Sequence, residues 1–166
     1  MEPIYIPQLA QAPDATEELA FKEYFSDLET LTPTQGNLKV IHQGNYIEVL
    51  LEAETIVTLT CHRCLQQYNH RLRVKTSEIL WLDATAEEEE NTALEKETPL
   101  ENLVEKLSPR GYFDPAQWIY EQLCLAMPSR QLCDQQCPGI AVEESSEELV
   151  DSRWAPLAAL KEQLPG

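Results

Sequence analysis

Four cysteines in two close pairs are the residues of this sequence best suited to chemistry. Two residues separate Cys61 from Cys64, and three separate Cys133 from Cys137. Two such pairs can supply four thiolates to one tetrahedral zinc ion. The spacing therefore predicts a structural zinc site made by Cys61, Cys64, Cys133 and Cys137. Four protein ligands leave no open position for catalysis by the metal.

The rival interpretation of the first pair is thiol–disulfide exchange by Cys61 and Cys64. A redox Cys-x-x-Cys pair usually begins a helix, whose N-terminus lowers the pKa of the thiol. Here the sequence that follows, from Leu65 to Tyr68, leads into a strand-like segment. An oxidoreductase is therefore the weaker of the two alternatives.

The remaining reactive side chains give little support for catalysis. Cys124 falls among the apolar residues of a predicted helix, where we expect it to be buried as a small hydrophobic side chain. The histidines His42, His62 and His70 lack a nucleophile or carboxylate partner in a recognisable motif. The sequence also lacks a glycine-rich phosphate loop and a Gly-x-Ser-x-Gly motif. We expect a protein that is not an enzyme.

One segment of this strongly acidic chain carries only basic charges. The net charge is -17, which favours basic partners over nucleic acid at long range. Yet no acidic residue occurs between Glu54 and Glu78, and Arg71, Arg73 and Lys75 share one face of a predicted strand. With Arg63, these three are the candidate contacts to RNA phosphates or another partner. A solvated strand face is the alternative explanation.

Length and composition predict one domain over residues 1–166. We expect a mobile acidic insertion at about residues 83–99 and an acidic linker at about 141–149. The N-terminus does not resemble a secretory signal, and no apolar run approaches the length of a membrane helix. The sequence thus predicts a cytoplasmic protein. Because the cytoplasm is reducing, its paired cysteines are expected to bind zinc rather than to form disulfides.

Several predicted elements position these residues. Tyr46–Thr60 alternates apolar and polar side chains and should form a hairpin with Gly36–Gln43, while Tyr68–Leu82 should be the strand after the first cysteine pair. Asp114 should cap a helix that ends near Met127. We also expect an edge strand at Ile4–Ile6 and helices over Glu17–Leu31, Leu100–Leu107 and Asp151–Leu164. The fold class is α+β, a mostly antiparallel sheet with packed helices and a four-cysteine zinc knuckle.

The order of these motifs resembles the YceD family, the large ribosomal RNA subunit accumulation proteins. The resemblance covers about residues 36 to 160. It rests on Cys61-His62-Arg63-Cys64-Leu65 after a strand, an acidic insertion, a helix ending in Ala126-Met127-Pro128, the Cys133 to Gly139 turn and Asp151-Ser152-Arg153-Trp154. It implies a small intracellular α+β protein, a cyanobacterial or plastid-like member, linked to accumulation of large-subunit rRNA and without enzymatic activity. The family's cysteine positions fall on the same four cysteines.

The first functional hypothesis is a factor in biogenesis of the large ribosomal subunit. It would bind precursor rRNA or a basic ribosomal protein, with no DNA or membrane partner. The alternatives are a thiol–disulfide oxidoreductase using Cys61 and Cys64, and a zinc-stabilised adaptor unrelated to ribosomes. The charge balance favours a basic protein slightly over RNA.

Overall fold

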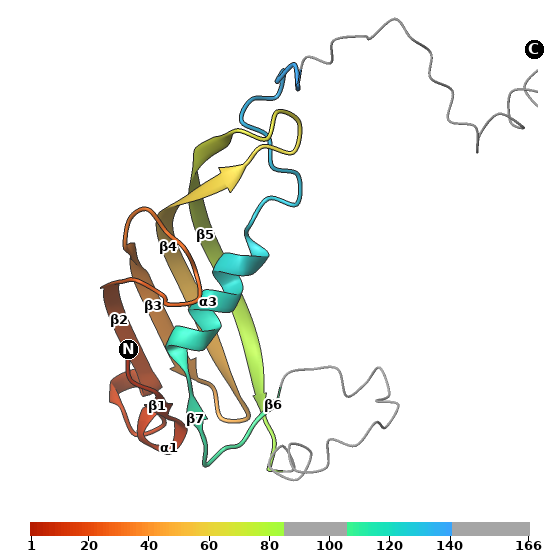
Figure 1. Ribbon diagram of the computed structural model, residues 1–166. Coiled ribbons are helices and arrows are strands. Elements are labelled where there is room, and N and C mark those ends of the chain that lie inside the picture. The colour runs from red at the N-terminus through yellow and green to blue at the C-terminus, as the bar shows by residue number, and fades with distance from the viewer. Residues whose placement is uncertain (85–105, 141–166) are drawn as a thin grey trace, which may run out of the picture.

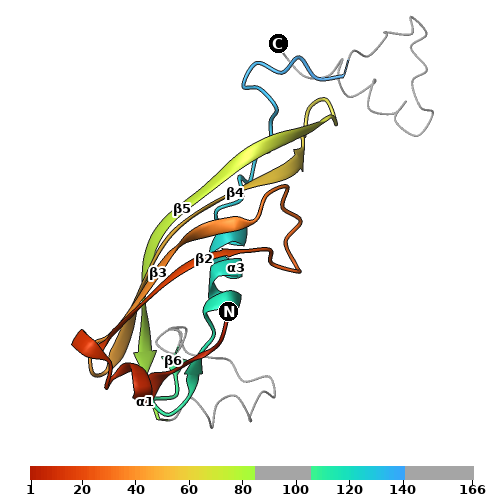
Figure 2. The ribbon, with the colours of Figure 1, turned by 90° about the vertical axis from the view of Figure 1, so that its left-hand side faces the viewer.

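One helix packs on one face of a five-stranded sheet (Figures 1 and 2). The computed structural model describes residues 1–84 and 106–140 of the chain. The strand order is β2-β3-β4-β5-β6, antiparallel except for the parallel pair β5–β6, which confirms a mostly antiparallel sheet with packed helices. The strands are β2 (Thr16–Glu23), β3 (Thr34–His42), β4 (Tyr46–Thr60), β5 (Gln67–Leu82) and β6 (Lys106–Leu107).

Two hairpins form the centre of the sheet. β3 and β4 pair from Gln35 opposite Glu54 to His42 opposite Ile47, as the sequence predicted. β4 and β5 pair over the whole length of β4, and Cys61 follows directly at the tip of this second hairpin. Odd-numbered side chains of β4 point to the inner face that the helix covers, because side chains alternate along a strand. The buried strand residues include Leu38, Val40, Ile47, Val49, Leu51, Val57, Leu59, Leu72, Val74 and Leu80.

The helix α3 (Pro115–Leu125) covers the inner face of the sheet. The Asp114 carboxylate caps its first turn by accepting hydrogen bonds from the backbone N–H groups of Ala116 and Gln117 at 2.9 and 3.1 Å. Trp118, Ile119 and Leu123 form its buried stripe. The predicted helix is therefore confirmed, although it ends before Met127.

A close approach between β3 and β4 requires glycine at position 36. A Cβ atom at Gly36 would lie 2.2 Å from the carbonyl oxygen of Glu52 and 2.7 Å from the Cα atom of Ala53. Phe21 stands opposite Gly36 in the register of β2 and β3, and its ring is buried. The missing side chain thus lets the strands pack closely at a point that an aromatic ring covers.

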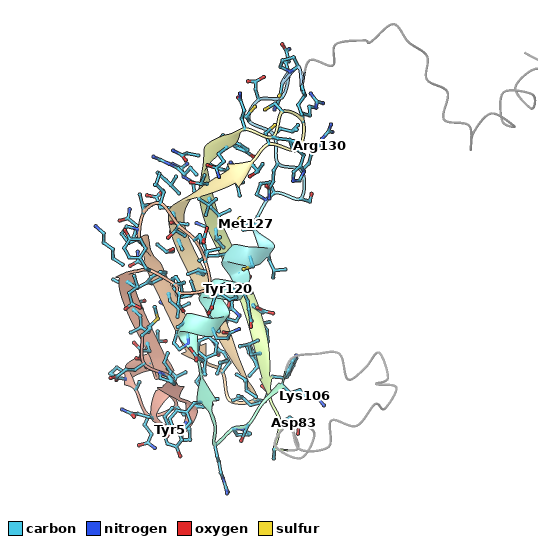
Figure 3. All side chains as sticks on the ribbon, viewed as in Figure 1. Tyr5, Asp83, Lys106, Tyr120, Met127 and Arg130 are labelled. Carbon is cyan, nitrogen blue, oxygen red and sulfur yellow. The ribbon has the colours of Figure 1, made fainter. Side chains whose placement is uncertain are left out.

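A smaller sheet closes the end of the molecule opposite the cysteine-bearing hairpin tip. β1 (Ile4–Tyr5) pairs with β7 (Tyr112–Phe113), and it leads into the short helix α1 (Ile6–Leu9) and the 3-10 turn η1 (Pro13–Ala15). The predicted edge strand is thus correct for Ile4 and Tyr5, whereas Ile6 begins α1. At the same end Asp83 and Lys106 approach each other across β5 and β6 (Figure 3), with Lys106 Nζ 3.5 Å from Asp83 Oδ2.

Three expectations are wrong. The predicted helix over Glu17–Leu31 is instead strand β2 followed by a loop, because Leu19 and Phe21 also fit a period of two and β3 supplies a pairing partner. Lys106 and Leu107, predicted to end a helix, form β6 beside Trp81 and Leu82.

The third wrong expectation concerns Cys124, which is exposed rather than buried. It follows Leu123 in α3 and so points away from the buried stripe. The remaining predictions for residues 85–105 and 141–166, which include most of the acidic insertion, the acidic linker and a helix over Asp151–Leu164, lie outside the described residues.

Candidate metal centre

Two segments remote in sequence meet at the tip of the β4–β5 hairpin. Cys61 and Cys64 lie in the turn that joins these strands. After α3 the chain runs past Met127 and Arg130 to the same tip, where Cys133 and Cys137 lie (Figure 3). The fold therefore brings all four predicted ligands into one cluster, in which their sulfur atoms lie within 4.8 Å of one another.

The spacing of the sulfur atoms suits a tetrahedral metal. Cys61 Sγ lies 3.8 Å from Cys137 Sγ, and Cys64 Sγ lies 3.7 Å from Cys133 Sγ. A tetrahedral ion with Zn–S bonds of ~2.3 Å has sulfur atoms ~3.8 Å apart. A disulfide bond would need ~2.05 Å, and all of these cysteines are free thiols. The donor set and its spacing thus fit zinc.

The thiols influence each other's ionisation strongly. The backbone N–H of Cys133, and next that of Cys64, lowers the pKa of Cys61 to about 5. The Cys133 thiol donates hydrogen bonds to the sulfur atoms of Cys137 and Cys61, and these bonds, together with burial, raise the pKa of Cys133 to about 12. The backbone N–H of Gln66 lowers the pKa of Cys64, but burial and the thiols of Cys61 and Cys137 raise it above its usual value overall. Several thiolates at this distance repel one another, and a bound divalent cation would remove that repulsion.

Hydrogen bonds join the two turns independently of the sulfur atoms. Arg63 Nη1 donates to the carbonyl oxygens of Gln135 and Cys137 at 3.3 and 3.1 Å. The backbone N–H of His62 donates to the carbonyl of Gln131 at 2.8 Å, and the N–H of Gln131 donates to His62 Nδ1 at 3.4 Å. These contacts hold the second turn against the first, as the outer shell of a metal site commonly does.

Each turn is also closed by its own backbone. The N–H of Leu65 donates to the carbonyl of Cys61 at 2.9 Å, and the N–H of Cys137 donates to the carbonyl of Asp134 at 3.1 Å. Gly139 follows with a φ of +83°, a conformation that residues with a Cβ atom rarely adopt. The local sequence therefore forms two compact turns, each with both of its thiols directed at the other turn.

The predicted basic residues fall in two places. Arg63 lies within the cysteine cluster, where its guanidinium group is already hydrogen-bonded. Arg71, Arg73 and Lys75 lie on the outer face of β5, opposite α3. On that face Arg73 Nε lies 3.4 Å from Glu54 Oε2, and Lys75 forms an ion pair with Glu52.

A family model described as large ribosomal RNA subunit accumulation protein YceD matches residues 49–161. The chain belongs to the YceD family. The match spans both cysteine turns, β5 and α3, so the candidate metal centre lies within the part of the chain that matches the family model. YceD is linked to accumulation of large-subunit rRNA and is not a known enzyme family. No curated protein and no solved structure matches the chain.

Sequence reasoning for this YceD protein missed the contacts around the cysteines. Neither Gln131 nor the link from Arg63 to Cys137 follows from spacing, because both depend on how two distant segments meet. The only signal in the sequence is the position of Arg63 inside the first cysteine pair. Among the described helices, none has the length and apolar character needed to cross a membrane.

Proposed function

We propose that this protein is a non-enzymatic factor in large-subunit biogenesis, which promotes accumulation of large-subunit rRNA by binding precursor rRNA or a basic ribosomal protein. The family match over residues 49–161 is the observation that carries this proposal. The geometry supports it because the four cysteines form a compact cluster that suits a structural ion rather than a substrate.

We further propose that Cys61, Cys64, Cys133 and Cys137 bind one zinc ion. Its role is to fix the segment after α3 to the tip of the β4–β5 hairpin. Binding energy at such a site is also folding energy, since the unfolded chain does not hold the four thiolates together. The protein would then act as one rigid domain whose outer sheet face is free to meet a client.

Depletion and rescue in cells test the proposed function. Removing the protein should reduce mature large-subunit rRNA relative to small-subunit rRNA, and the wild-type chain should restore it. Affinity isolation with and without ribonuclease then identifies the client, because ribonuclease releases a client bound through RNA and leaves a ribosomal protein bound directly. Unchanged rRNA levels together with the absence of precursor particles would contradict the proposal.

A further inference from the structure

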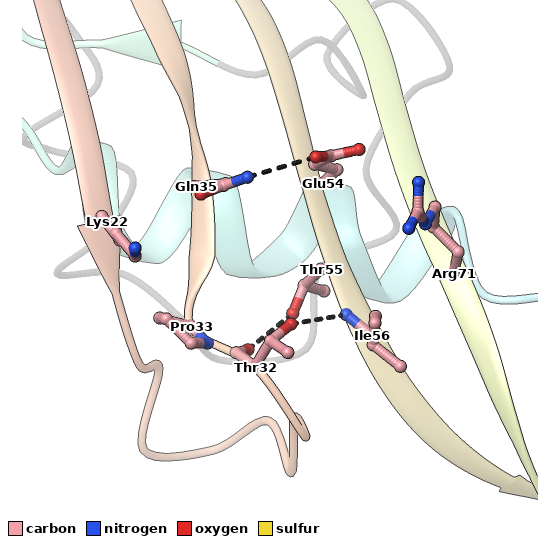
Figure 4. A pocket seen from close by; sticks show the side chains of 8 residues that line it. All are labelled: Lys22, Thr32, Pro33, Gln35, Glu54, Thr55, Ile56 and Arg71. Carbon is pink, nitrogen blue, oxygen red and sulfur yellow. Dashed lines mark hydrogen bonds between the residues drawn. The ribbon is translucent and has the colours of Figure 1, made fainter.

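The outer face of the sheet carries a cavity flanked by two cations. The cavity has a volume of about 270 Å³ and lies where the loop after β2 meets β4. Figure 4 shows Lys22 of β2 at one side and Arg71 of β5 at the other, with Gln35 and Glu54 between them. Both cations are exposed, and neither forms an ion pair with any residue in the described part of the chain.

The carboxylate of this cavity is already compensated. Glu54 Oε1 accepts a hydrogen bond from Gln35 Nε2 at 3.2 Å, and Glu54 Oε2 lies 3.4 Å from Arg73 Nε. Among the described residues Glu54 is also the one carboxylate that lines the cavity, so the charges of Lys22 and Arg71 together outweigh its charge. The hydroxyl of Thr32, which accepts a hydrogen bond from the N–H of Ile56, also lines the cavity and has a proton to donate. The cavity thus offers hydrogen-bond donors and net positive charge to an anion.

A second hollow continues this surface along β5. It has a volume of about 730 Å³, shares Lys22 and Glu54 with the first cavity, and is also lined by Arg73 and Lys75. The side chain of Lys75 is 83% exposed and that of Arg73 is 66% exposed. Exposed ion pairs of this kind are weak, so an incoming phosphate can compete for both cations.

From this placement we infer that the outer face binds the phosphate groups of a single-stranded RNA segment through Lys22 and Arg71, with Arg73 and Lys75 continuing the contact. The inference rests on the proposed function and names the client of that function. Arg71, Arg73 and Lys75 alternate along one strand, so their charges form a row that follows an extended backbone. A basic protein segment would be repelled by the same row.

An aromatic pair at the far end of the same face fits this client. Trp81 follows Lys75 along the outer face of β5 and is 42% exposed. Its ring meets that of Tyr46 edge to face, with the ring centroids 5.6 Å apart. Exposed aromatic rings on a sheet face are suited to stacking with unpaired bases. Phosphate contacts at one end and base stacking at the other would both follow from RNA bound along β5.

The test measures binding of a labelled single-stranded RNA oligonucleotide to the full zinc-loaded chain over a series of salt concentrations. In the variant with Lys22→Ala and Arg71→Ala, the slope of log K against log salt should become shallower by roughly 0.7 for each lost phosphate contact. Lys39→Ala is the matched control, since Lys39 lies on the same face but outside both hollows and pairs with Glu18 at 2.7 Å. Unchanged melting temperatures would show that all variants fold.

Three outcomes overturn the inference. The first is an unchanged slope of log K against log salt in the double variant. The second is a change of that slope in Lys39→Ala as large as the change in the double variant. The third is failure to bind the oligonucleotide while inorganic phosphate or a purified basic ribosomal protein does bind. In that last case the proposed function survives if depletion still lowers large-subunit rRNA, so the two failures are distinguishable.

Discussion

Arg63 joins the two halves of the cysteine cluster, since its Nη1 atom donates a hydrogen bond of 3.1 Å to the carbonyl oxygen of Cys137. The two residues lie 74 positions apart. The same nitrogen also reaches the carbonyl of Gln135 at 3.3 Å. The link therefore holds the second turn in place from the first turn, whether or not the sulfur atoms share an ion.

Replacing this arginine should weaken metal binding without removing a ligand. We predict that Arg63→Ala lowers zinc affinity roughly tenfold, as loss of outer-shell contacts commonly does. Competition with a coloured zinc chelator measures the affinity. Arg110→Ala is a suitable control because Arg110 is exposed and lies near β7, away from the cluster. Equal zinc affinities in Arg63→Ala and Arg110→Ala would show that the hydrogen bonds of Arg63 do not contribute to zinc binding.

Cys64 and Cys124 should respond differently to substitution, because Cys64 belongs to the cysteine cluster and Cys124 does not. We predict that Cys64→Ser loses bound zinc and lowers the free energy of unfolding by about 4 kcal/mol or more, in the range expected when a structural metal is lost. Cys124→Ser should keep one zinc per chain and its stability, because Cys124 is exposed and is not part of the cluster. Elemental analysis and denaturant unfolding measure both quantities. Retention of zinc by Cys64→Ser would argue against a four-cysteine site.

Metal removal should loosen one end of the molecule only. The core between α3 and the sheet does not include the cysteine turns, since Trp118, Ile119 and Leu123 pack there directly. We therefore predict that a chelator leaves the sheet spectrum in circular dichroism largely intact. Trypsin should then cut faster after Arg63 and Arg130, which lie at or near the cluster.

The internal control for this digestion is Lys39, which lies within β3 and should stay protected with or without metal. Adding zinc back should restore slow cleavage after Arg63 and Arg130. If the chelator speeds cleavage after Lys39 as much as after Arg63 and Arg130, the metal instead supports the whole fold. Identical digestion with and without chelator would mean that no metal stabilises the turns.

The sequence predicted the cluster better than its surroundings. Residue type and position in a turn are local properties of the sequence. They were therefore enough to predict the four cysteines as metal ligands, although nothing local shows that the two turns lie together. The role of Arg63 depends on the position of a segment beyond α3, which no local pattern contains. Lys22 was missed as a partner of Arg71 for another reason. The apolar spacing from Leu19 to Leu31 also fits a helix, and a helix there would not place Lys22 in the same sheet as Arg71. Pairing with β3 decided between the two periods.

A partly buried carboxylate fixes α3 to the sheet. Glu78 Oε2 accepts hydrogen bonds from Trp118 Nε1 at 2.8 Å and from Gln122 Nε2 at 3.0 Å. We predict that Glu78→Ala lowers the free energy of unfolding by about 1–3 kcal/mol, because the N–H of the buried Trp118 ring then lacks an acceptor. Glu78→Gln should cost less, since its amide oxygen can still accept a hydrogen bond.

A double-mutant cycle with Trp118→Phe separates this hydrogen bond from packing. Once the indole N–H is gone, Glu78→Ala should cost much less than in the wild-type background, and the difference gives the coupling energy. Urea unfolding of the four proteins, all zinc-loaded, supplies the free energies. Strictly additive losses would show that Trp118 and Glu78 act independently, and the helix would then be held by its buried apolar stripe alone.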